Sequence, residues 1–168
     1  RLKVFVFMGD GDCTAIGGNH FIHACRRNID ITAIVMNNNI YGMTGGQYSP
    51  LTPYGKKATT APYGNIDHSF DLVELAKGAG ATYVARGDVS HMKQLSDLIV
   101  EGAQHKGFSV IEAMTPCPTS FGRYNKTPDP AQMLQIFRDV TVSVKRAEKM
   151  TAEELEGKIL TGVFVNRE

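Results

Sequence analysis

The 168-residue chain lacks several features that would place it in familiar protein classes. It has no tryptophan and only three cysteines, Cys13, Cys25 and Cys117, and their wide spacing does not predict a disulfide framework. It has no run of about 18 apolar residues, so no membrane-spanning helix is predicted. No signal peptide is visible in the sequence. The cytoplasm is therefore the expected compartment.

An excess of charge of one sign is also missing. The formal net charge is +1, which gives no reason to expect a nucleic acid or a membrane as a partner. The phosphate-binding patterns GxGxxG and GxxxxGK[ST] do not occur, which disfavours a non-catalytic nucleotide-binding or assembly module. Apolar residues make up 42% of the chain, which is ordinary for a globular domain. The length predicts one domain over residues 1–168.

Apolar runs alternate with helical patterns along the chain. Strands are predicted near residues 3–8, 31–36, 82–85, 108–114 and 158–165. Helices are predicted near residues 14–28, 70–77, 90–104 with Ser90 as cap, and 130–149, followed by a capping box at Thr151. This alternation predicts an α/β fold with a doubly wound, mainly parallel sheet flanked by helices. Residues 38–66 and 115–129 lack any apolar period, and loops of such length are usually functional.

Two of the predicted strands end in clusters of polar residues. The sequence Gly-Asp-Gly-Asp at residues 9–12 follows the first strand, and three asparagines at 37–39 follow the second. Parallel strands deliver their carboxyl ends to one edge of a sheet, where open α/β sheets bind ligands. Magnesium binds one or two protein carboxylates and completes its octahedron with ligand phosphates. Asp10 and Asn38 offer suitable oxygens, so the pattern predicts a magnesium–diphosphate site.

A longer motif narrows this prediction. The asparagines continue into Ile-Tyr-Gly-Met-Thr-Gly-Gly-Gln at residues 40–47. With the GDG and NN elements, this stretch resembles the thiamine diphosphate motif of the β subunits of 2-oxoacid:ferredoxin oxidoreductases. The likeness continues through residues 49–50, 61–65, 106–108, 117–119 and 121–123. Residues 106–113, 117–123 and 147–155 look most like the 2-oxoglutarate branch of that family.

The resemblance implies a set of ligand-binding residues. It assigns magnesium to the side chains of Asp10 and Asn38 and to the backbone oxygen of Ile40. It assigns thiamine diphosphate to Gly9, Gly11, Asp12, Tyr41, Gly42, Met43 and Thr44. Met43 stands where the family has a bulky apolar residue beside the thiazolium ring, although a core position is the alternative. Asp12 is expected to accept hydrogen bonds behind the metal, because a second carboxylate would repel the diphosphate.

Cys117 lies between Pro116 and Pro118. A free buried thiol is the ordinary interpretation of such a cysteine. The resemblance instead implies a ligand of a [4Fe–4S] cluster, which needs four thiolates. Cys13 and Cys25 do not have a ferredoxin-type spacing, so the other three ligands are expected outside this chain. The chain is accordingly expected to be the C-terminal part of a longer β subunit, lacking its N-terminal segment.

The implied activity is the oxidative decarboxylation of a 2-oxoacid, 2-oxoglutarate in the first place. Coenzyme A would take the acyl group, and electrons would pass through the cluster to ferredoxin. No catalytic residue is identified in this chain, and the chain is expected to be inactive without its partner α subunit. The alternatives are a pyruvate or branched-chain 2-oxoacid:ferredoxin oxidoreductase, or a cluster-free thiamine diphosphate decarboxylase or synthase. Lys56, Lys57 and Arg123 are candidates for binding a substrate carboxylate or a coenzyme A phosphate.

Overall fold

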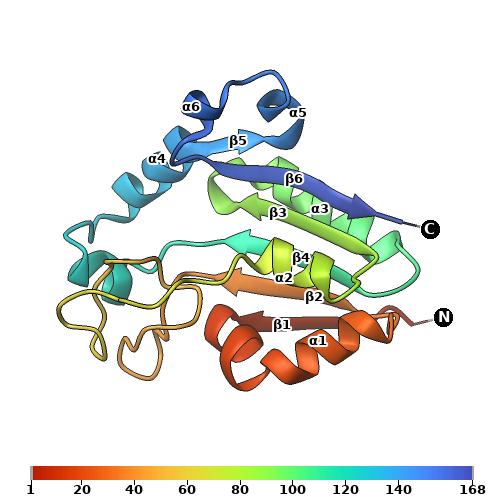
Figure 1. The fold of residues 1–168 in the computed structure, drawn as a ribbon, viewed down its shortest axis with the longest axis horizontal. Coiled ribbons are helices and arrows are strands. Elements are labelled where there is room, and N and C mark those ends of the chain that lie inside the picture. The colour runs from red at the N-terminus through yellow and green to blue at the C-terminus, as the bar shows by residue number, and fades with distance from the viewer. Residues whose placement is uncertain (1, 168) are drawn as a thin grey trace.

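A mixed β-sheet forms the centre of the molecule. The computed structural model describes residues 2–167, and six strands occur among them. They are β1 (Phe5–Gly9), β2 (Thr32–Asn37), β3 (Tyr83–Asp88), β4 (Ser109–Met114), β5 (Thr141–Ser143) and β6 (Ile159–Asn166). Their order across the sheet is β1-β2-β4-β3-β6-β5 (Figure 1). Neighbouring strands are parallel except for β3 and β6, so the predicted mainly parallel sheet is confirmed.

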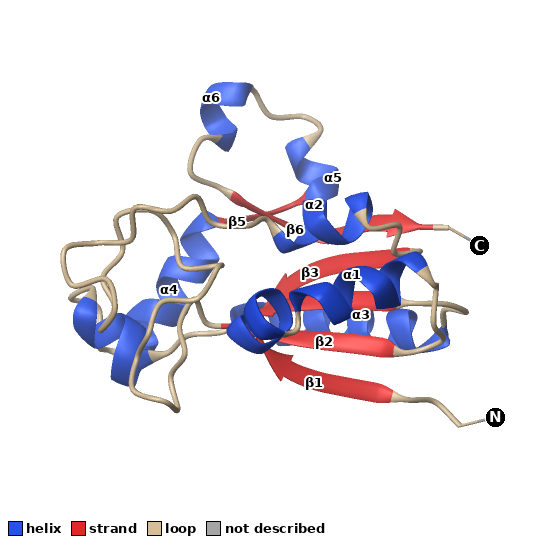
Figure 2. Cartoon of the chain, turned by 60° about the horizontal axis from the view of Figure 1, so that its bottom comes forward, coloured by secondary structure: helices blue, strands red, loops and turns tan. Residues whose placement is uncertain are grey.

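Helices cover both faces of this sheet. They are α1 (Gly18–Arg26), α2 (Leu72–Gly78), α3 (Met92–Gln104), α4 (Pro130–Val140), α5 (Val144–Ala147) and α6 (Ala152–Leu155). Helices α1 and α2 lie in front of the parallel strands in Figure 2, and α3 lies behind them. The doubly wound arrangement expected from the alternation of apolar runs and helical patterns is therefore confirmed. None of the helices within residues 2–167 has the length and apolar character needed to cross a membrane.

The apolar cores follow from the two-residue period of the strands. In β2, Val35 packs with Phe21 of α1 and Val73 of α2 on one face of the sheet. The neighbouring residue Ile34 packs on the other face with Leu95 and other residues of α3. A strand buried on both faces has a continuous apolar sequence, as the buried residues 33–35 do. Full burial of each such side chain stabilises the fold by about 1.5–3 kcal/mol.

The helix predicted over residues 14–28 is interrupted. Residues Asp12–Ile16 form a short π-helix, in which the N–H of Gly17 donates to the carbonyl oxygen of Asp12 at 2.9 Å. Helix α1 starts only at Gly18. Single π-type turns occur frequently at functional sites. The predicted cap at Ser90 is also wrong, because Asp88 accepts the Ser90 N–H at 2.8 Å and caps a 3-10 turn that precedes α3.

The prediction of one helix over residues 130–149 is wrong. Helix α4 ends at Val140, and Thr141–Ser143 form β5, which pairs in parallel with β6. Residues 140–142 are Val-Thr-Val, and consecutive β-branched side chains favour extended backbone over helix. Ser143 then caps α5. The final strand and the capping box of Thr151 with Glu154 are as predicted.

Two long polar segments gather at one edge of the sheet. Residues 38–71 connect β2 to α2, and residues 115–129 connect β4 to α4. Figure 1 shows both at the left, where the arrowheads of the parallel strands point. The first segment is folded on itself, for example through Gly55 N to the oxygen of Asn65 (2.7 Å) and Asn65 N to the oxygen of Lys56 (2.8 Å). The carboxyl edge therefore carries most of the irregular chain.

Strand β1 lies at the opposite margin of the sheet from β5, with β2 as its paired neighbour. The side chains of Phe5 and Phe7 are 42% and 67% exposed, and their ring centroids lie 6.5 Å apart. Val4 and Val6 are 48% and 37% exposed. Within residues 2–167, this edge strand thus presents apolar side chains that no other element covers fully.

Candidate functional site

Asp10 and Asn38 meet at the carboxyl edge, although 28 positions separate their residue numbers. Strand β1 pairs with β2 so that Gly9 lies opposite Met36. The residues that directly follow these two strands therefore leave the sheet side by side. Asp10 is only 1% exposed, and the backbone of Asn38 lies close enough to its carboxyl group to lower the pKa of that group. The sequence prediction that these two residues share one site agrees with this geometry.

The environment of Asp10 suits a cation. Burial raises the pKa of its carboxyl group, while hydrogen bonds from Ser49 and from the backbone of Asp10, Asn38 and Gly11 lower it by less. Ser49 donates its hydroxyl to the carboxylate. A buried carboxylate with a raised pKa lacks a compensating positive charge, and a bound divalent ion would provide one. The donor chemistry at Asp10 therefore fits a magnesium ion.

The structure separates the roles of the three asparagines. The amide of Asn37 points into the sheet, where its Nδ2 donates to Glu112 and its Oδ1 accepts the N–H of Asn39. Asn39 adopts a left-handed backbone with φ of 63°, and its carbonyl oxygen accepts from Thr52. Asn38 Oδ1 accepts one longer bond, 3.2 Å from the N–H of Ile40. Asn38 is thus the asparagine whose oxygen is best placed to take a metal.

Ile40 anchors the turn that follows. Its side chain is 2% exposed and packs in a small cluster with Ala58 and Cys117. The magnesium assignment of its backbone oxygen stays a prediction, as do those of Asp10 and Asn38. The buried side chain nevertheless holds the residue at a fixed place beside the Asp10 loop.

Tyr41 lies over the glycine-rich loop. A Cβ placed on Gly11 would lie 2.2 Å from the Tyr41 ring, so only glycine permits this approach. Partial burial raises the pKa of Tyr41, and the charges of Asp12 and then Asp10 raise it further. The segments 9–12 and 40–44, both predicted to hold the cofactor, are therefore in contact.

The other predicted cofactor residues differ in exposure. Met43 is fully exposed at 102%, so it lies outside the core formed by residues 2–167. The Thr44 hydroxyl donates to Gln47 Oε1 at 2.7 Å. Asp12 is exposed and accepts the N–H of Gly9 at 3.2 Å, in keeping with a hydrogen-bonding role. Met43 is therefore free to contact a ligand or a neighbouring subunit.

Cys117 lies next to the same loop. It is 7% exposed, and its Sγ would be 3.4 Å from a Cβ placed on Gly42. A second π-helix, Pro118–Gly122, begins directly after it, with Gly122 N bonded to the Cys117 oxygen at 2.8 Å. Among residues 2–167, no group of three or more His, Cys, Asp or Glu side chains is arranged to hold a metal ion. Cys13 and Cys25 pack in the separate core under α1, so they do not join Cys117.

Comparison with known proteins decides the family. The C-terminal thiamine pyrophosphate (thiamine diphosphate) binding domain of thiamine pyrophosphate enzymes matches residues 1–113. The chain belongs to this family. The GDG and NN motifs, on which the sequence prediction was based, both lie within the matched region.

Two relatives and one solved structure narrow the resemblance. The chain is 56% identical over 165 residues to the 2-oxoglutarate synthase subunit KorB of Methanocaldococcus jannaschii, covering 98% of this chain and 61% of that protein. It is 52% identical over 166 residues to KorB of Methanothermobacter thermautotrophicus, covering 99% and 58%. A 2-oxoglutarate:ferredoxin oxidoreductase from Magnetococcus marinus matches with a TM-score of 0.80 and 30% identity, covering 95% of this chain and 55% of that one. The resemblance to this group of thiamine pyrophosphate enzymes is confirmed, and the chain spans about three-fifths of the relatives' length.

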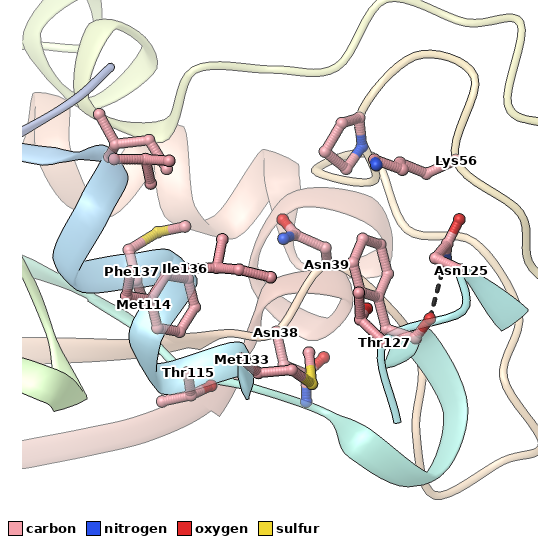
Figure 3. A pocket seen from close by; sticks show the side chains of 14 residues that line it. Asn38, Asn39, Lys56, Met114, Thr115, Asn125, Thr127, Met133, Ile136 and Phe137 are labelled. Carbon is pink, nitrogen blue, oxygen red and sulfur yellow. Dashed lines mark hydrogen bonds between the residues drawn. The ribbon is translucent and has the colours of Figure 1, made fainter. Parts of the chain in front are cut away.

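A pocket of about 250 Å³ opens beside the asparagines of this thiamine pyrophosphate domain. Figure 3 shows Asn38 and Asn39 between apolar side chains of α4, among them Met133 and Phe137, and the opposite wall that carries Lys56. Asn125 joins the walls by donating to the oxygens of Lys57 (3.0 Å) and Phe121 (2.9 Å). The pocket thus offers a mainly apolar lining with three carboxamides and one ammonium group.

Sequence reasoning missed several residues that support the site. Ser49, which bonds Asp10, lies in a loop with no pattern to mark its partner. Arg86 and Glu112 are buried and form an ion pair with Arg86 Nε 2.6 Å from Glu112 Oε2. A charged residue within each of two mostly apolar strands was the signal that each of them needs a buried partner.

Proposed function

We propose that the chain is the thiamine diphosphate-binding part of the β subunit of a 2-oxoacid:ferredoxin oxidoreductase that acts on 2-oxoglutarate. The observation that supports this most is the buried Asp10 carboxylate, held against the backbone of Asn38 at the carboxyl edge of the sheet. The proposal also draws on the similarity to proteins named as 2-oxoglutarate synthase subunits.

Residues of this chain would hold the cofactor in defined ways. Asp10, Asn38 and the oxygen of Ile40 would bind magnesium, and the glycines at 9 and 11 would let the backbone approach the diphosphate. Tyr41, Gly42, Met43 and Thr44 would line the remainder of the cofactor, with the exposed Met43 directed at the thiazolium. When bound, thiamine diphosphate supplies the electron sink for loss of CO₂ from a 2-oxoacid.

Cys117 would supply one thiolate of a [4Fe–4S] cluster. Its sulfur lies against Gly42, so a cluster there would stand beside the loop that lines the cofactor, and electrons would travel a short path. Three further thiolates would come from parts of the full-length protein outside these residues. Thiolate ligation needs reduced cysteines, which agrees with a cytoplasmic location.

The proposed partners are an α subunit, ferredoxin and coenzyme A. The Magnetococcus marinus neighbour has 2-oxoglutarate, coenzyme A and succinyl-CoA bound. In this chain Met43, Tyr63 and Ile66 are 102%, 97% and 82% exposed on the loop between β2 and α2. Such large exposed side chains near the site suit contact with a second subunit.

The test uses the full-length chain purified with its partner subunit and loaded with magnesium and thiamine diphosphate. The complex is expected to reduce ferredoxin with 2-oxoglutarate in a reaction that requires coenzyme A, and to do so faster than with pyruvate. A preference for pyruvate or a branched-chain 2-oxoacid would move the enzyme to another branch of the same group. Decarboxylation without any reduction of ferredoxin would overturn the proposal in favour of a cluster-free enzyme.

A further inference from the structure

A network of polar side chains, buried except for Asp71, runs beneath the turn at residues 37–39. Asp71, which caps α2, accepts from Arg86 of β3 at 2.7 Å. Arg86 also donates to Glu112 of β4 at 2.6 Å, and Glu112 accepts from Asn37 of β2 at 2.7 Å. Arg86, Glu112 and Asn37 are 9%, 2% and 4% exposed. The hydrogen-bond network thus crosses three neighbouring strands and ends at Asn37, one residue before Asn38.

Arg86 is the one positively charged member of this network. Burial lowers the pKa of Arg86, but the ion pairs with Glu112 and Asp71 more than offset that effect and raise it. The guanidinium therefore stays charged, and it donates to Oε2 of Glu112. Removing either partner of a buried pair leaves an uncompensated charge, which is strongly destabilising. Both oxygens of Glu112 act as acceptors here, Oε2 from Arg86 and Oε1 from Asn37.

This fixed acceptor sets the orientation of the Asn37 amide. Since Oε1 of Glu112 acts as an acceptor, it selects the Nδ2 side of Asn37, and Oδ1 must point the other way. There Oδ1 accepts the N–H of Asn39 at 3.0 Å and closes a tight turn around Asn38. The backbone oxygen of Asn37 is held as well, by the N–H of Thr115 at 2.8 Å. Contacts with β4 and with Thr115 therefore fix the orientation of the turn that carries Asn38 and Ile40.

We infer that Glu112 and Asn37, supported by Arg86, are positioning residues for the magnesium ligands Asn38 and Ile40. They touch neither metal nor cofactor, and they act by holding the turn in the geometry that a rigid octahedral ion demands. The inference rests on the proposed function, because it assumes that the turn binds magnesium with thiamine diphosphate.

Exchanging the amide at position 37 and the carboxylate at position 112 tests this inference. In Asn37→Asp, two carboxylates face each other. In Glu112→Gln, the amide cannot accept from both Arg86 and Asn37. In the double variant, the new amide at position 112 donates to the new carboxylate at position 37 and accepts from Arg86, while that carboxylate still accepts from Asn39. Each single variant is expected to weaken magnesium binding about 10- to 100-fold, and the double variant to recover to within about threefold of wild type.

The measurement is calorimetric titration of magnesium into the full-length complex with saturating thiamine diphosphate, well below each melting temperature. Ser109→Ala is the matched control, because it removes a buried hydrogen bond of the same strand, to Gly102 O at 2.8 Å, at the end away from the site. It is expected to lower the melting temperature without changing the magnesium affinity. If a single variant does not assemble, Asn37→Ser replaces it with the same expectation.

Two results overturn the inference. One is a double variant that binds magnesium no better than the single variants. The other is a set of single variants that behave like Ser109→Ala, losing stability but keeping wild-type affinity. A wild-type complex that binds no magnesium with thiamine diphosphate is a different result, since it would contradict the proposed function itself.

Discussion

The hydroxyl of Ser49 donates a hydrogen bond to the carboxylate of Asp10 across 39 positions of sequence. The same hydroxyl accepts the N–H of Leu51, and the N–H of Ser49 donates to Thr52 at 2.8 Å. The loop between β2 and α2 is therefore fastened to the carboxylate that we assign to magnesium. Loop position and metal site are linked through one buried side chain.

The first prediction concerns the charge of Asp10. Replacing Asp10 by Asn removes a buried carboxylate whose pKa burial has raised, while keeping an oxygen for Ser49. The cofactor-free complex is expected to gain on the order of 1 kcal/mol, a rise in melting temperature of about 2–4 °C. The same variant is expected to lose binding of magnesium with thiamine diphosphate, measured by calorimetry.

The matched control for that prediction is Asp12→Asn. Asp12 is exposed and accepts only a 3.2 Å bond from Gly9 among the described residues, so its effect on the melting temperature is expected to correspond to no more than about 0.5 kcal/mol. Retention of magnesium and cofactor by Asp10→Asn at wild-type affinity would contradict the assignment of this carboxylate.

A second prediction concerns Gly11. A methyl group there collides with the ring of Tyr41, so Gly11→Ala must push Tyr41 away or shift the loop. Such overpacking costs about 1–3 kcal/mol, and cofactor affinity is expected to fall with stability. Gly78→Ala is the control, since its Cβ meets no atom within 4 Å at the end of α2. Equal melting temperatures and cofactor affinities for the two variants would show that the Tyr41 contact is unimportant.

The third prediction addresses Cys117. Cys117→Ser in the full-length complex is expected to lower the iron content and the rate of electron transfer to ferredoxin. Magnesium and thiamine diphosphate should remain bound, because those sites use other ligands. Iron analysis and the EPR signal of the reduced cluster provide the measurement. Wild-type values for both would identify Cys117 as a buried thiol without a metal.

The fourth prediction concerns the two core cysteines. Burial raises the pKa of Cys13 and Cys25 to about 12, from an ordinary value of 9.0. Both thiols are therefore expected to resist alkylation in the native protein at about pH 8 and to react once it is unfolded, as mass spectrometry would show. Rapid native labelling of either residue would contradict its burial.

The same shift has a consequence for stability. Above about pH 9 the unfolded chain loses thiol protons that the native chain keeps up to about pH 12, so the native state binds more protons in that interval. The free energy of unfolding is therefore expected to fall as the pH rises from about 9 toward 12. Urea unfolding of Cys13→Ala should show a shallower fall than wild type.

The sheet and the edge that carries the site were predictable from the sequence. A short, largely apolar run followed by polar residues, such as 32–36 before the asparagines, identifies a strand without knowledge of its neighbours. The GDG and NN clusters could be assigned to one edge because parallel strands share their direction. Local sequence information was sufficient for these features.

Features decided by distant contacts were not predictable. The β-branched residues 140–142 favour extended backbone locally, but the pairing of Thr141–Ser143 with β6 involves a partner that residues 130–149 do not identify. The contact between Glu112 and Asn37 depends on β4 lying next to β2, an order that differs from the order along the chain. A charged residue in a mostly apolar strand signals a buried partner, but the sequence does not show which residue that partner is.

Strand β1 has a practical consequence for handling residues 2–167 by themselves. An edge strand with free backbone groups and exposed Phe5 and Phe7 is a template to which another strand can add. Concentrated samples of this segment alone are thus expected to form intermolecular β-structure and to bind amyloid-sensitive dyes. The substitution Phe7→Lys would introduce a charge on that face and should keep the segment dispersed, as light scattering would show.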